Sequence, residues 1–253
     1  MEQITFRLSI KNNPLAIGFM SLLTHEYAQV AKLIKTESLM ISDKYPCDIC
    51  VQEYDIETNP YPNPKVKFTN CTDHRRMSSN HYILPFLVNS QYMPLYKKRK
   101  KVQKKYKCVT MYRITKDIRQ RIIENAKKIC DIVIVNDEIL YAKYPEDYNL
   151  DASHDYYEIM DKSEFVLCPP GVIHDTYRYS ESLYCNSIPL PIRNDDIKYV
   201  IPHPTEYSWT EENLGQFKFP EFNEGVLSSL QRIVNEDFMA NYVSEIINKH
   251  ITS

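Results

Sequence analysis

The sequence predicts an α/β protein in two lobes, the second of which is a doubly wound parallel sheet. A buried strand at 108–112, an amphipathic helix at 116–130 and a further strand at 131–135 follow one another, as in a βαβ unit. A second strand, turn, helix and strand run from 163 to 192. The chain has 253 residues, 43% of them hydrophobic, which suffices for one large or two smaller cores.

Residues 1–95 form the first predicted lobe. Alternation from Ile4 to Ile10 indicates a strand, and apolar positions at helical spacing predict a helix that extends to Ile34. Four prolines between 43 and 64 prevent a continuous helix there and predict a long irregular loop or a small hairpin. An apolar segment at 82–87 closes this lobe.

Eight lysines and arginines between 97 and 107 separate the lobes. Such a run is typical of a solvated linker or helix face, and an anion-binding strip is the alternative. Its place between two lobes favours the linker.

Residues 96–223 form the second predicted lobe. After the βαβ unit we expect a helix at about 156–162, a strand at 165–168, a helix at 175–184 and a strand at 188–192. Ligands of such sheets bind beyond the carboxyl ends of the strands. That rule points to Arg113, to the loop around 169–178 and to the segment after 192.

A long apolar periodicity from 224 to 251 predicts a C-terminal helix. We expect residues 224–253 to pack across the two lobes and to carry no chemistry of their own.

The segment from Ser163 to Leu183 carries the most informative pattern. A buried strand ends in Pro169-Pro170-Gly171, and a helix that Asp175 can cap begins soon after. Arg178 and Glu181 lie three residues apart and therefore share a helix face. Backbone N–H groups, a guanidinium and a carboxylate at one strand end suit a nucleoside diphosphate: the first two bind phosphate oxygens and the carboxylate accepts from ribose hydroxyls. A plain surface ion pair is the alternative.

This segment resembles the donor-binding signature of exostosin-like glycosyltransferases: Ser-Lys-Phe-x-Leu-x-Pro-Pro-Gly, then Asp-x-x-Arg-x-x-Glu-Ala-Leu, then Gly-x-Ile-Pro. The residues that match are Ser163, Phe165, Leu167, Pro169, Pro170, Gly171, Asp175, Arg178, Glu181, Leu183, Ile188 and Pro189. The chain departs from the signature at Ser182, where the family has alanine, and around Asn186-Ser187, where it has glycine. Asparagine tolerates the left-handed backbone that often ends a helix, so the turn can survive.

The resemblance implies a fold of the GT-B type, with two Rossmann-like lobes of which the N-terminal one is reduced. It implies an inverting transfer of a sugar from a nucleotide-sugar donor to a glycan acceptor, with no cofactor required for catalysis. By position, Glu181 would bind the ribose, and Arg178 with the loop at Pro170, Gly171 and Asp175 would face the diphosphate. Arg113, from its place after a strand, is a candidate second diphosphate contact, and an exposed loop arginine is the alternative.

An inverting transfer needs a general base, which the first lobe should supply. Asp73 and His74 are the candidates by residue type, although a surface loop position is the alternative for each. A competing interpretation joins Cys47 and Cys50 to Cys71 and His74 as two half-sites of a structural zinc. Unconnected thiols are the other interpretation, and a zinc-bound His74 could not act as a base.

Composition excludes several classes of protein. The four glycines cannot form a P-loop or a dinucleotide fingerprint. A net charge of −2 gives no general attraction to nucleic acid, so we expect no nucleic-acid partner. The longest apolar run is too short for a membrane span, no secretory signal begins the chain, and the seven cysteines are expected to be reduced, which favours a cytoplasmic location.

A glycosyltransferase is therefore the leading hypothesis from the sequence. A nucleotide- or carbohydrate-binding protein of the same fold without transfer activity is the main alternative, and a zinc-stapled interaction protein is the third.

Overall fold

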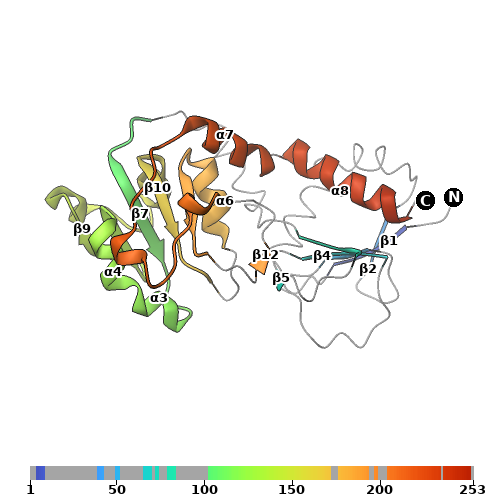
Figure 1. The fold of residues 1–253 in the computed structure, drawn as a ribbon, viewed down its shortest axis with the longest axis horizontal. Helices are drawn as coiled ribbons and strands as arrows, with labels where there is room; N and C mark the ends of the chain where they lie inside the picture. The colour runs from blue at the N-terminus through green and yellow to red at the C-terminus, as the bar shows by residue number, and fades with distance from the viewer. Residues whose placement is uncertain are drawn as a thin grey trace. The chain divides into compact units, whose positions relative to one another are not determined.

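The computed structural model describes residues 4–8, 39–42, 49–51, 65–69, 72–73, 79–83, 102–171, 176–193, 197–198, 204–234 and 236–251. The chain divides into two compact units (Figure 1). The first combines Met1–Met93, Asp196–Ile201 and Arg232–Ser253, and the second combines Pro94–Asp195 and Pro202–Gln231.

The first unit contains a parallel five-stranded sheet. Its strands are β1 (Ile4–Leu8), β2 (Leu39–Ser42), β3 (Ile49–Val51), β4 (Val66–Thr69) and β6 (His81–Ile83), in the order β2-β1-β3-β4-β6. The strand predicted from Ile4 is confirmed as far as Leu8. The irregular loop predicted for 43–64 is wrong at β3, which pairs in parallel with both β1 and β4 and so is no part of a hairpin. The helix predicted before Ile34 lies outside the described residues.

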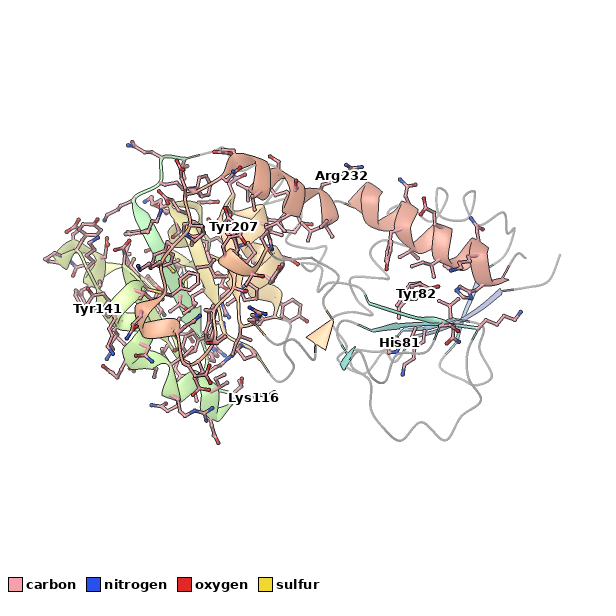
Figure 2. All side chains as sticks on the ribbon, in the orientation of Figure 1. His81, Tyr82, Lys116, Tyr141, Tyr207 and Arg232 are labelled. Atoms are coloured by element: carbon pink, nitrogen blue, oxygen red, sulfur yellow. The ribbon has the colours of Figure 1, made fainter. Side chains whose placement is uncertain are left out.

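The C-terminal helix α8 (Glu236–Ile251) packs against β4 in this unit. Tyr82 of β6 lies between the sheet and α8 (Figure 2), and its hydroxyl is 2.5 Å from Nε2 of His250. The two rings meet edge to face. A two-stranded antiparallel ribbon of β5 (Thr72–Asp73) and β12 (Ile197–Lys198) completes the described strands of the unit.

The second unit contains a mixed five-stranded sheet. Its strands are β7 (Tyr106–Tyr112), β8 (Ile132–Val135), β9 (Glu138–Ala142), β10 (Ser163–Cys168) and β11 (Ile188–Pro191), in the order β11-β10-β7-β8-β9. All neighbours pair in parallel except β8 and β9. The parallel strands are almost wholly buried, as expected for a sheet with helices on both faces. The four parallel strands confirm those predicted from the sequence.

Both sheets begin with the same strand order. In each, the first strand pairs with the second on one side and with a later strand on the other, which gives β2-β1-β3-β4 in the first unit and β8-β7-β10-β11 in the second. The direction of winding therefore reverses beside β1 and beside β7. Open α/β sheets bind ligands at such reversals, outside the carboxyl ends of the strands.

Four α-helices in the described part of the second unit connect its strands. Between β7 and β8 lie α3 (Asp117–Arg121) and α4 (Ile123–Ile129); α5 (Tyr156–Asp161) precedes β10, and α6 (Tyr177–Tyr184) joins β10 to β11. The α3–α4 pair and α6 cover opposite faces of the sheet (Figure 1) because right-handed crossovers run in opposite directions from β7. The single helix predicted for 116–130 is therefore two short helices that meet at Ile122.

A hairpin from β8 to β9 adds an antiparallel edge to this sheet. Asn136 and Asp137 form its turn with φ of 51° and 67°. Two successive residues with left-handed backbone are the mark of a tight hairpin whose twist matches that of its strands. This strand pair was not predicted.

The described lysines of the basic run belong to the second unit and form hydrogen bonds and ion pairs with its other elements. Nζ of Lys104 donates to the carbonyl oxygens of Asp161 and Asn186, at 2.9 Å and 2.7 Å, at the C-terminal ends of α5 and α6. Lys105 pairs with the buried Asp147 of the 3-10 helix η2 (Pro145–Asn149), and Lys107 pairs with Glu164. The expectation of a purely solvated linker is wrong for these three residues.

The predicted C-terminal helix is two helices, α7 (Glu224–Ile233) and α8. In the second unit, 3-10 helices η3 (Thr205–Tyr207) and η4 (Leu214–Gln216) lead toward α7. Trp209 between them is fully buried, and its Nε1 donates to the carbonyl of Leu190 in β11. Among the helices that the structure describes, none has the length and apolar character needed to cross a bilayer.

Candidate functional site

The carboxyl ends of β7 and β10 separate at the reversal of winding. The backbone ladder between them reaches Val109 and Val166, and one step further the hydroxyl of Thr110 donates to the carbonyl of Leu167 at 3.0 Å. Beyond this point β7 is paired only with β8. Strand β10 is paired only with β11 as far as Cys168, its last residue. The turn that follows Cys168 therefore begins where the two central strands have moved apart.

Thr176 caps helix α6 on the far side of this turn. Its backbone is extended and its hydroxyl accepts from the backbone N–H of Arg178 at 3.1 Å. The sequence predicted Asp175 as the cap, and this is wrong: the helix begins one residue later than that cap requires. Asp175 itself lies outside the described residues.

Arg178 lies in the first turn of α6 and is half-buried. Its Nε is buried and makes no hydrogen bond within the described part of the chain. No carboxylate among the described residues lies within ion-pair distance of its guanidinium, so the alternative of a plain surface ion pair with Glu181 is wrong. A buried donor without a partner loses the free energy of a hydrogen bond, about 1–3 kcal/mol, and an anion would restore it.

Glu181 lies one turn later on the same helix, also half-buried. The hydroxyls of Tyr156 and Tyr157, both from the first turn of α5, donate to its two carboxylate oxygens at 2.7 Å and 3.4 Å. Burial raises the pKa of Glu181, although the nearby Arg178 charge and the tyrosine hydroxyls oppose that rise. Burial also raises the pKa of Tyr156, so its hydroxyl keeps the proton that it donates. The carboxylate is thus an oriented acceptor beside a guanidinium whose Nε has no partner among the described residues.

Arg119 is another residue of this region, besides the two tyrosines, that the sequence did not reveal. It comes from α3 and is 6% exposed. Its guanidinium donates to the carbonyls of Pro170 and Arg113, each at 2.7 Å, and of Pro169 at 3.2 Å. Burial and repulsion by the Arg178 charge lower the pKa of Arg119 to about 10. Two guanidiniums that repel each other favour an anion between or beside them.

The side chain of Arg113 makes its contact elsewhere than at the guanidiniums of Arg119 and Arg178. Its side chain is 74% exposed, and its Nη2 lies 2.7 Å from a carboxylate oxygen of Asp137 in the β8–β9 turn. Only its carbonyl takes part in the region, as an acceptor for Arg119. In the turn itself Pro170 is buried and Gly171 half-buried.

The two departures from the exostosin-like signature fit the local backbone. Asn186 has a φ of 54°, and the N–H groups of Asn186 and Ser187 bond to the carbonyls of Leu183 and Ser182 at 3.1 Å and 2.9 Å. This is the Schellman motif that usually uses glycine, and it confirms that asparagine ends the helix here. Ser182 is buried and its hydroxyl donates back to the carbonyl of Arg178.

The candidates of the first lobe cannot be placed in the same way. Cys47, Cys71 and His74 lie outside the described residues. Cys50 is part of β3 and Asp73 is part of β5, where it is paired with Ile197, but only the backbone is described for both. The base and the zinc site both stay predictions.

Comparison with models of known protein families and with curated protein sequences gives no match.

Proposed function

We propose that the protein is a glycosyltransferase that binds a nucleoside diphosphate sugar at the carboxyl ends of β7 and β10 and transfers the sugar to a glycan acceptor. The observation that carries this proposal is the unpaired Nε of Arg178, buried at the start of α6, three residues before an oriented carboxylate. The resemblance of the segment from Ser163 to Pro189 to the exostosin-like signature supports it.

The diphosphate would bind where three sources of positive charge meet. These are the guanidinium of Arg178, the partial charge at the N-terminus of α6, and the field of Arg119 behind the turn. A phosphate oxygen that accepts from Nε of Arg178 would satisfy its missing partner in the charge-assisted geometry that arginine forms with phosphate.

The ribose would bind to Glu181. A carboxylate has about four lone-pair sites, and the tyrosine hydroxyls use two of them, so ribose hydroxyls have acceptors left. The tyrosines hold the carboxylate in one orientation before the ligand arrives, which reduces the conformational entropy lost on binding.

The remaining parts of the proposal concern the transfer itself. The general base would be Asp73 or His74, the transfer would be inverting, and no metal would be needed for the chemistry because the two guanidiniums would offset the charge of the leaving diphosphate. The alternative use of Cys47, Cys50, Cys71 and His74 as zinc ligands would be structural. We further propose that the enzyme works in the cytoplasm.

A panel of nucleoside diphosphate sugars tests this proposal. One donor should raise the melting temperature of the wild-type protein, because a ligand that binds only the native state stabilises it. Arg178→Gln should remove the effect. Arg113→Gln removes the same charge from an exposed, ion-paired position and should keep it, which makes it the matched control.

The stabilising donor is then incubated with simple sugars, and products are detected by mass spectrometry. A glycosylated acceptor or a hydrolysed donor supports an enzyme. Binding without either reaction would favour the non-catalytic nucleotide-binding protein, and stabilisation by no donor would refute the proposed function.

A further inference from the structure

The carboxyl ends of β7 and β10 are joined by one side chain. Arg119 donates to the carbonyl of Arg113, the first residue after β7, and to those of Pro169 and Pro170, the first residues after β10. The backbone hydrogen bonds between β7 and β10 end before these residues, and the three bonds of Arg119 connect the two strand ends beyond that point. The Pro-Pro-Gly turn is therefore held from the α3 side of the sheet.

The geometry of these bonds requires a guanidinium. Its planar fork presents Nε, Nη1 and Nη2 in fixed directions, and each donates to a different carbonyl. The ammonium of a lysine donates from a single nitrogen, so it can join carbonyls that converge on one point, as Lys104 does, but it lacks three separate nitrogens directed at three carbonyls. The ring of Tyr112 lies 5.8 Å from the guanidinium carbon, and its hydroxyl donates to the Arg119 carbonyl at 3.1 Å, which fixes α3 to the end of β7.

Arg119 has no ionic partner among the described residues, and each of its three nitrogens already donates to a carbonyl. It contributes a positive charge near Arg178 while its nitrogens are bonded to the turn and to the end of β7. A residue with these contacts acts on a ligand through the backbone that it holds.

We propose that Arg119 is a positioning residue that fixes the Pro169-Pro170-Gly171 turn in the conformation that binds the diphosphate. This inference rests on the proposed donor site. It assigns to α3, which lies outside the signature segment, the role of holding this turn.

Replacement of Arg119 by lysine and by glutamine tests the inference, with inorganic pyrophosphate and the nucleoside diphosphate of the stabilising donor as probes. Arg121→Gln is the matched control, because Arg121 is on the same helix but exposed and paired with Glu211. Affinity is measured calorimetrically on the full chain, and the emission of the single tryptophan, Trp209, reports whether the second unit is folded.

Both Arg119 variants should bind pyrophosphate at least about tenfold more weakly than the wild type, because loss of a single hydrogen bond to a charged phosphate changes the dissociation constant by about tenfold or more. Arg121→Gln should bind as the wild type does. Retained affinity in Arg119→Lys with loss in Arg119→Gln would show that only the charge matters, and would overturn the positioning role.

Two further outcomes are decisive. If neither Arg119 variant keeps the native Trp209 emission, Arg119 is a determinant of the fold and a role specific to the turn is wrong. If the wild type itself binds neither probe, the proposed donor site fails together with this inference, an outcome distinct from failure of the Arg119 variants alone.

Discussion

A substitution of Glu181 distinguishes binding of the ribose of a donor from binding of its phosphates. If it binds the ribose, Glu181→Ala should weaken binding of a nucleoside diphosphate but leave inorganic pyrophosphate, which has no ribose, unaffected. Hydrogen bonds to a charged group contribute about 1.5–3 kcal/mol, so the dissociation constant of the nucleoside diphosphate should rise roughly 10- to 150-fold.

The contacts of Glu181 require a second variant. Alanine also deprives the hydroxyls of Tyr156 and Tyr157 of their acceptor, which should lower the free energy of unfolding by about 1–3 kcal/mol. Glu181→Gln keeps one acceptor oxygen, so it should be the more stable of the two variants while it still binds the nucleoside diphosphate more weakly than the wild type.

Titration calorimetry with the two ligands and urea unfolding followed by Trp209 emission measure these effects separately. Equal loss of affinity for both ligands would place Glu181 at the phosphates instead. Unchanged affinity for the nucleoside diphosphate in both variants would remove the ribose assignment.

Three further predictions concern stability and are read from the same urea unfolding. Asn186→Ala should lower the free energy of unfolding by about 1–2 kcal/mol because its φ is 54°, whereas Asn186→Gly should cost less; equal costs would refute the strain argument. Thr176→Ala should cost about 0.5–2 kcal/mol through loss of the bond from the Arg178 N–H, with Thr176→Ser as the control that keeps it. The pKa of Glu181 is raised in the folded state, so its contribution to the free energy of unfolding is fully present below the unfolded pKa and is lost as pH rises through the folded pKa. Glu181→Gln should lack this decline in stability. Identical pH profiles of stability for the variant and the wild type would contradict the argument.

The sequence predicted the parallel strands of the second unit because the pattern that indicates each strand lies within the strand and its immediate neighbours. The run Ile132–Val135, for example, is apolar throughout and follows a segment of helical period, which is the pattern of a strand buried on both faces. The hairpin to β9 also had a local signal: Asn136 and Asp137, between two apolar runs, are residue types that favour the turn of a tight hairpin.

The site depends on contacts that no local pattern encodes. Arg119 stands beside apolar helix positions and has the residue type of an exposed face, yet its partners are three carbonyls, two of them 50 and 51 residues away. Nor do residue types decide which of the neighbours Asp175 and Thr176 caps α6. The resemblance to the signature made Arg178 and Glu181 candidates, whereas the tyrosines that orient Glu181 come from a separate helix and were not predicted.

A crystal structure of the protein with the nucleoside diphosphate of the stabilising donor tests the central claim most directly. We expect phosphate oxygens within hydrogen-bond distance of the Arg178 guanidinium, including Nε, and the ribose hydroxyls on the carboxylate of Glu181. A nucleotide bound away from the start of α6, with Nε of Arg178 still unpaired, would contradict the account.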